Sequence, residues 1–230
     1  MWVFRTSSCA FCSIVYKSFI CTDVLSKEKE LFITSNIFAR FHSISWGKYA
    51  LFTLLLTAAG MAGKVTIPGT QVGITMQTFV LMLVALNLTR TEGLSVLTTY
   101  IALGSAGLPV FSGGMSTAAL VGPSAGFIWG FIPALLISEK LARSTRENTQ
   151  SLTVRFLGYS AALTAGMMVF LYLFGVSVQS AITGLSWTAL MSASLAFIPL
   201  DIVKALVAVA LTLGITGLAR TVRTLKKKQE

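Results

Sequence analysis

Six stretches of the chain are apolar enough and long enough to be membrane-spanning helices. A bilayer core about 30 Å thick needs about 20 apolar residues in each helix. The segments that meet this test are 46–63, 74–90, 93–108, 121–138, 152–175 and 198–218. The pattern predicts an all-α integral membrane protein whose six transmembrane helices lie within residues 46–220.

The composition agrees with this interpretation. The chain is 54% hydrophobic and 11% charged, and its mean hydropathy is +0.78. These values exclude a disordered chain and exceed those of soluble domains. A net charge of +10 is also found in nucleic-acid-binding proteins, but here the basic residues form no continuous face. We therefore exclude nucleic acid as a partner and expect membrane lipid instead.

The positive charges predict the orientation of the six helices. Except for Lys64 and Lys204, every lysine and arginine lies in one of four regions: residues 1–48, the second connection at residue 90, the fourth connection and its border at 140–155, or 220–228. An even number of spans puts these regions on one side, which the positive-inside rule assigns to the cytoplasm. We expect both termini there, with residues 221–230 as a basic cytoplasmic tail.

The N-terminal region, residues 1–45, differs from the rest of the chain. Its stretch SCAFCSIVYKSFI is too short to span a membrane and contains Lys17. A cleaved signal peptide is also disfavoured, because no small-residue cleavage site follows. We interpret this region as a cytoplasmic extension and leave open whether it is disordered.

Three connections on the outward side are poor in charge and rich in glycine, namely 64–78, 107–126 and 175–187. Irregular backbone near membrane depth must be buried in protein or line a cavity, because lipid cannot satisfy its polar groups. We expect these loops to form the lid or wall of a pocket, with Gly113 and Gly114 allowing close approach of the main chain to a ligand. A plain flexible connection is the alternative that composition leaves open.

The last apolar segment contains two charged residues, Asp201 and Lys204. Each unpaired charge within a bilayer costs roughly 2.5–3.5 kcal/mol on insertion scales, and such residues usually have a function. Pro199 favours a helix that starts near Ile198, which would place the aspartate among the free N–H groups of the first turn and the lysine on the same face. The pair would offer one acceptor and one cationic donor to a ligand, whereas a purely structural ion pair is the alternative.

Small residues recur at helical spacing in two other segments. Gly122, Gly126 and Gly130 lie on one face of their helix and favour close helix packing. In the first segment Ala58 and Ala62 form a small-xxx-small pair, which predicts either internal packing or contact with a partner helix.

Several kinds of chemistry have no support in the sequence. Its three cysteines lie within the first 21 residues and its single histidine is isolated, so no zinc spacing can be assembled. GPSAG matches the nucleophile-elbow pattern, but it starts an apolar segment rather than following a strand, and no histidine lies nearby. The Walker A pattern is missing as well, so the chain cannot hydrolyse ATP by that route. We predict no enzyme activity and no cofactor, and a partner or a gradient must supply any energy for transport.

Four stretches in the expected order together resemble the BioY family, the biotin-specific S components of energy-coupling-factor (ECF) vitamin transporters. The resemblance covers roughly residues 46–220. The stretches that carry it are ITMQTF (74–79), GLPVFSGG (107–114), GPSAGFIWGF (122–131) and FIPLDIVKA (197–205).

The resemblance implies a six-helix S-component-like bundle whose outward loops and last helix enclose biotin. Asp201 and Lys204 match the family's polar pair, and Gln77 matches the glutamine of the first motif. Gly113 and Gly114 match the ligand-covering loop, in which Met115 comes next, and Phe127 stands where the family shows tyrosine. Implied partners are a membrane coupling protein, for which Ala58 and Ala62 are the candidate contacts, and two ATPase subunits.

This chain also departs from the family pattern at several positions. Met115, Ser116 and Thr117 follow the two glycines where the family tends to continue with glycine, Leu200 replaces a glycine before the aspartate, and Ala125 replaces another. A close analogue of biotin is therefore an open alternative as the ligand.

Two main hypotheses follow. The first is capture of biotin from the outside, energised by a separate ATPase module. The second is a self-sufficient secondary transporter of biotin or a close analogue, driven by an ion gradient through the buried aspartate. The charge pattern shows no inverted repeat that would favour the second hypothesis.

Overall fold

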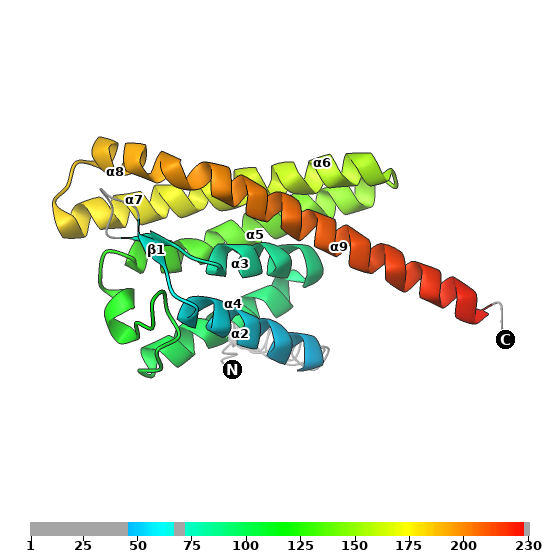
Figure 1. The fold of residues 1–230 in the computed structure, drawn as a ribbon, viewed down its shortest axis with the longest axis horizontal. Helices are drawn as coiled ribbons and strands as arrows, with labels where there is room; N and C mark the ends of the chain where they lie inside the picture. Colours follow the sequence, from blue (N-terminus) through cyan, green and yellow to red (C-terminus); the bar gives the residue numbers. More distant parts are fainter. Residues whose placement is uncertain (1–45, 67–71, 228–230) are drawn as a thin grey trace, which may run out of the picture. The chain divides into compact units, whose positions relative to one another are not determined.

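The computed structural model describes residues 46–66 and 72–227, with side chains up to residue 218 (Figure 1). All of these residues belong to one compact unit, Ser45–Glu230. The predicted extension 1–45 lies outside the described residues. The elements are, in chain order, α2 (Trp46–Met61), β1 (Val65–Thr66), β2 (Gly73–Ile74), α3 (Gln77–Asn87), α4 (Arg90–Ser105), η1 (Thr117–Leu120), α5 (Ala125–Asn148), α6 (Leu152–Leu163), η2 (Thr164–Met168), α7 (Val169–Thr183), α8 (Trp187–Ser194), η3 (Leu195–Phe197) and α9 (Ile198–Lys227).

The helices run back and forth between two ends of the unit. The strands β1 and β2, the loop between α4 and α5, and the α7–α8 connection lie at one end, at the left of Figure 1. The α3–α4 and α5–α6 turns lie at the other end, toward which α9 also runs. We call the first end the outward end, because it carries the three connections that the charge pattern places outside.

Two of the helical paths are longer than single elements. The π-helical turn η2 joins α6 to α7, and α8 continues through the 3₁₀ turn η3 into α9, so helix runs over 152–183 and over 187–227. Together with α2, α3, α4 and α5 these paths give six helical rods, one for each predicted segment. Within the described residues, three rods are long and apolar enough to cross a membrane by themselves: Ala125–Asn148, Leu152–Thr183 and Trp187–Leu218.

The second predicted span, 74–90, is wrong in its extent, because α3 comprises only Gln77–Asn87. Its N-terminal part is taken by an unpredicted two-stranded hairpin, in which Val65 pairs with Ile74 and Thr66 with Gly73. At the other end, Leu88 is extended and Thr89 begins a capping box with Glu92, which starts α4. The first outward connection is therefore partly a hairpin.

The third predicted outward loop, 175–187, is also wrong in its extent. Helix α7 continues to Thr183 and ends at Gly184, whose φ of 71° is left-handed. Gly175 does not break the helix, because its missing side chain leaves room for the ring of Phe127, which a Cβ would overlap. The irregular part of this connection is confined to residues 184–186.

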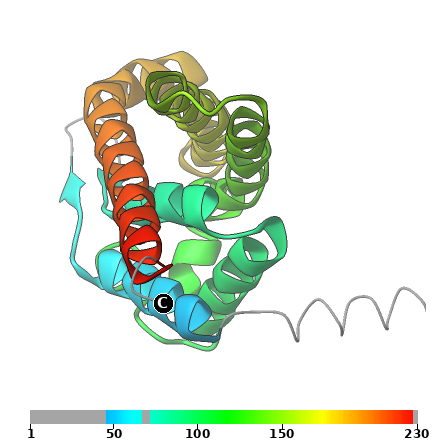
Figure 2. The same cartoon turned by 90° about the vertical axis from the view of Figure 1, so that its right-hand side faces the viewer.

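Helix α5 lies at the centre of the unit and contacts α3, α4, α6 and α7. Its contact with α7 passes through Gly126 and Gly130: a Cβ at Gly126 would overlap Phe174 and Val178, and one at Gly130 would lie 3.2 Å from Phe174. The packing prediction is confirmed for these two glycines and wrong for Gly122, which precedes α5 and whose Cβ would meet only the backbone of Ala118. Figure 2 shows the rods end-on, with α9 along one side of the unit.

Candidate ligand-binding site

Asp201 and Lys204 lie in the first two turns of α9, and each is only 6% exposed. Helix α9 begins at Ile198, as Pro199 predicts, but α8 and η3 precede it without a break. The expectation that the helical path starts at Ile198 is therefore wrong, and a free helix start is not what holds the carboxylate. Side chains from other helices hold this carboxylate instead.

The ammonium of Lys204 uses all three of its donors within the protein. It donates to the carbonyl oxygen of Thr75 at 2.8 Å, to Oγ1 of Thr78 at 3.1 Å and to Oδ1 of Asp201 at 3.0 Å. An ammonium has three N–H groups, so no donor is left over. The lysine ties α9 to α3 and to the residues just before it.

The carboxylate of Asp201 is held from three elements. Tyr172 of α7 donates its hydroxyl to Oδ2 at 2.6 Å, while Lys204 and, at 3.4 Å, Thr78 of α3 donate to Oδ1. The ring of Tyr172 stacks on Phe197, with ring centroids 6.5 Å apart. A carboxylate accepts about four hydrogen bonds, so Asp201 keeps capacity for a further donor.

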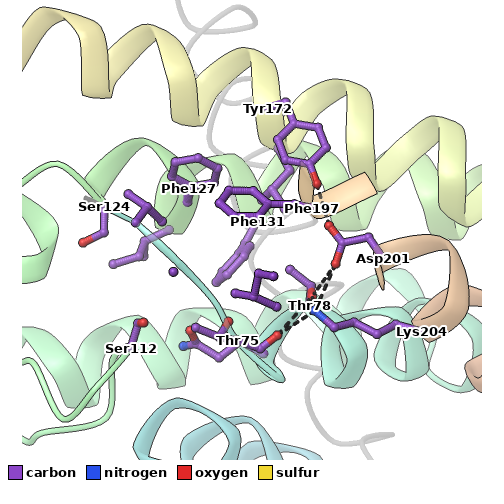
Figure 3. Close-up of a pocket in the computed structure, with 16 residues that line it drawn as sticks. Thr75, Thr78, Ser112, Ser124, Phe127, Phe131, Tyr172, Phe197, Asp201 and Lys204 are labelled. Atoms are coloured by element: carbon purple, nitrogen blue, oxygen red, sulfur yellow. Dashed lines mark hydrogen bonds and ion pairs between the residues drawn. The ribbon is translucent and has the colours of Figure 1, made fainter. Parts of the chain in front are cut away.

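A pocket lies beside this pair (Figure 3). Its apolar side chains come from β2 and the residue before it, from α5, α7 and η3, whereas α3 and α9 contribute polar or charged ones. The volume of this cavity is about 60 Å³. The cavity is therefore narrow in this conformation. Its lining residues are Val72, Gly73, Ile74, Thr75, Gln77, Thr78, Ser112, Ser124, Phe127, Ile128, Phe131, Leu171, Tyr172, Phe197, Asp201 and Lys204.

The BioY family matches residues 35–221. The chain belongs to the BioY family. It is thus a multi-pass membrane protein, and the family match begins eleven residues before the resemblance seen in the sequence.

Individual BioY relatives are similar over most of their length. The chain is 32% identical to the biotin transporter BioY of Rhizobium etli over 163 residues, which is 70% of this chain and 87% of the relative. It is 31% identical to the biotin transporter BioY of Thermotoga maritima over 174 residues, which is 74% of this chain and 95% of the relative.

Among solved structures, the fold is similar to that of the S component for biotin from an ECF-type ABC transporter. The TM-score is 0.67 at 21% identity, over 75% of this chain and 90% of the other. At that identity the match concerns the fold alone. The BioY chain described here therefore has the S-component fold, built from all-α rods with one short hairpin.

Two other predicted site residues of this BioY chain also line the pocket. Phe127 forms part of the apolar wall and packs on Gly175. Gln77 is buried, and its side-chain amide donates to the hydroxyl of Tyr100, which in turn donates to the carbonyl oxygen of Val110 at 3.1 Å. Gln77 thereby connects the pocket wall with the loop that follows α4.

The other residues predicted to bind the ligand are Gly113, Gly114 and Met115. They follow Ser112, which lines the pocket, but do not line it themselves. Phe111 donates its N–H to the carbonyl oxygen of Met115 at 2.9 Å, and Gly114 donates to that of Phe111 at 2.9 Å. The two glycines have φ of 72° and 75° and so form the turn between these residues. Their role toward a ligand stays a prediction.

Sequence reasoning missed Tyr172, Thr75 and Thr78, which hold the charged pair. Tyr172 could have been found from the sequence, because a tyrosine hydroxyl within an apolar helix needs a hydrogen-bond partner. Thr75 and Thr78 could not have been found in this way, because more than a hundred residues separate them from their contacts in α9.

Proposed function

We propose that this chain captures biotin from the outside as the S component of an ECF-type transporter. Asp201 supports the proposal most directly, because it is a buried carboxylate on a pocket wall with acceptor capacity to spare. The ureido ring of biotin presents two N–H donors and one carbonyl, and its thiophane ring is apolar. The relatives named as biotin transporters share the family of this chain.

The two charged residues would then have different tasks. Asp201 accepts a ureido N–H directly, since its carboxylate is already oriented by Tyr172. Lys204 neutralises that carboxylate in the apolar interior and fixes its position. It can donate to a ligand carbonyl only by releasing Thr75 or Thr78.

Binding also requires the pocket to widen, because it is too narrow for a bicyclic ligand as it stands. We expect the strand pair from which Gly73 and Ile74 line the pocket to move, because the turn that contributes Ser112 is anchored by the hydrogen bond from Gly113 to Gly60 of α2. Helices α5 and α7 pack closely on each other through glycine contacts, and we expect the part of the pocket wall that they form to stay in place.

In the membrane, we propose six spans with both termini in the cytoplasm, surrounded by lipid. A membrane coupling protein and two ATPase subunits would supply the energy for transport. The exposed C-terminal part of α2 supports this part of the proposal, since Ala58 and, directly after the helix, Ala62 are exposed. A small-residue stripe lets a partner helix approach closely.

Equilibrium binding of labelled biotin to the full chain in mild detergent tests the proposal. Wild-type protein should bind tightly, and Asp201→Asn should weaken binding more than about tenfold, since a hydrogen bond to a charged group is lost. Unchanged affinity in this variant would remove the site assignment. In vesicles, uptake should require ATP and the partner subunits, whereas accumulation driven by a proton gradient alone would favour secondary transport.

A further inference from the structure

A second hollow lies on the other side of Lys204, between α9, the start of α3 and the connection from α2 into β1. Its volume is about 540 Å³, against about 60 Å³ for the ligand pocket. In Figure 2, β1 and α9 lie on the same side of the unit. We call this hollow the side groove. Its wall is mostly apolar and includes Met76, Phe79, Leu200, Val203 and Val207.

Helix α9 presents different residues to the two cavities. Leu200, Val203 and Val207 recur at spacings of three and four residues, so they form one stripe along the helix, and this stripe lines the side groove. Asp201 lines only the ligand pocket. Leu200, which stands where the BioY pattern has a glycine, therefore changes the groove and not the pocket.

The side groove opens toward the bilayer. Val203 is 53% exposed, Met76 49% and Val207 45%. The two valines belong to the rod Trp187–Leu218, which is long and apolar enough to cross a membrane. Exposed apolar side chains of such a rod face lipid. The hollow between them has to be filled by hydrocarbon or by another helix, because an empty hollow loses the van der Waals contacts of its lining.

Lys64 brings a positive charge to this apolar groove. It is exposed, it lines the groove, and it lies just beyond the end of α2. It is also the only charged residue in the three outward connections of the sequence. Over residues 46–66 and 72–218, its ammonium forms no ion pair with a carboxylate. The groove thus combines a long apolar wall with one cation that has no counter-ion in this part of the chain.

We propose that the side groove binds an anionic phospholipid of the outward leaflet, with the lipid phosphate at Lys64 and one acyl chain along Leu200, Val203 and Val207. An ammonium donates strong, charge-assisted hydrogen bonds to a phosphate. The groove lies at the outward end of the unit, so the headgroup reaches Lys64 while the acyl chain points into the bilayer along α9. Phosphatidylglycerol has the required chemistry.

The bound lipid also shields the charged pair of the ligand pocket. Ile74, Thr75 and Lys204 line both cavities, so a single layer of residues separates the groove from the pocket. Within this layer, Lys204 donates to the carbonyl oxygen of Thr75 at 2.8 Å. An acyl chain against the layer keeps water away from this hydrogen bond, which is stronger in surroundings of low dielectric constant.

Photo-cross-linking in nanodiscs tests this inference. The full chain is placed in phosphatidylcholine that contains a trace of phosphatidylglycerol or phosphatidylcholine with a diazirine on one acyl chain, and the labelled residues are identified by mass spectrometry. On Met76 and Leu200 we expect about fivefold more labelling by phosphatidylglycerol, the size of one lysine's attraction to anionic lipid. Lys64→Met should abolish this preference by lowering only the phosphatidylglycerol labelling, and Lys64→Arg should retain it.

Matched variants test the two parts of the site separately. Lys48→Met removes an exposed lysine from the other end of α2 and should keep the preference. Val203→Trp fills the groove and should reduce the labelling of Met76 by both lipids. Ile202→Trp should not, because Ile202 is exposed next to Val203 but lines neither cavity.

Three results would overturn the inference. The first is equal labelling of Met76 and Leu200 by the two lipids in the wild-type chain, and the second is a preference that Lys64→Met leaves intact. The third is no labelling of these residues by either lipid, which would indicate that a second copy of the chain or another helix covers the groove. The proposed function would stand in each case, because Lys64 does not line the ligand pocket.

Discussion

The pocket has two polar ends: an inner end with Asp201 and Lys204, and an outer end with Ser112 and Ser124. They differ in how many of their hydrogen bonds the protein itself supplies. At the inner end, Tyr172 and Lys204 hold the carboxylate of Asp201, and the lysine has a protein partner for every donor. At the outer end, the hydroxyl of Ser112 has no partner within the described part of the chain. The inner end is thus organised before any ligand arrives, whereas the outer end leaves one buried hydroxyl open to a further partner.

This difference follows from where each end is built. The inner end lies on α3, α7 and α9, so its polar groups are far from water and an unpaired charge there would be costly. The outer end lies on the turn of Ser112 and at the start of α5, which the proposed topology places nearer to the aqueous side, where an incomplete set of hydrogen bonds costs less. Helices therefore carry the charged pair, and a turn between helices carries the incompletely satisfied hydroxyl.

The largest effect should come from breaking the inner pair. Asp201→Ala leaves the ammonium of Lys204 buried without its counter-ion, which should lower the free energy of unfolding by about 3–5 kcal/mol. Unfolding by dodecyl sulfate in mixed micelles measures this quantity. The double variant Asp201→Asn with Lys204→Met removes both charges and should recover most of the loss while still failing to bind biotin.

Two results would contradict this expectation. Equal stability of Asp201→Ala and wild type would mean that the pair is not buried as described. Full biotin binding by the double variant would mean that the inner end does not recognise the ligand.

A smaller effect is expected from Tyr172→Phe, which removes only the hydroxyl that orients the carboxylate. Biotin binding should weaken about tenfold, because a hydrogen bond to a charged group is lost. Tyr159→Phe is the control, since the hydroxyl of Tyr159 accepts from Arg146 at 3.4 Å outside the pocket lining. If Tyr172→Phe binds biotin as tightly as Tyr159→Phe and wild type do, Tyr172 has no role in positioning Asp201.

Much of this arrangement could be predicted from the sequence. Charges within an apolar segment are rare enough to point to a site, and Asp201 and Lys204 do lie together on the pocket wall. The glycine spacing of α5 identified the face that packs on α7. Both signals depend only on residues close together in the chain, which is why the sequence is sufficient for them.

The rest depends on contacts between distant segments. The Tyr172–Asp201 hydrogen bond joins α7 to α9, and Lys204 reaches a carbonyl oxygen before α3. Composition also misplaced the third outward loop, because Gly175 serves packing against Phe127 rather than a turn. The capping box of Thr89 and Glu92 marks the start of α4 in the sequence itself. It was missed because the spans were assigned from hydropathy alone.

The most direct test of the central claim is a structure of this chain with biotin bound. The account predicts a ureido nitrogen within about 3.2 Å of a carboxylate oxygen of Asp201, which is hydrogen-bond distance. It would be contradicted by biotin bound elsewhere while Asp201 and Lys204 contact only protein atoms.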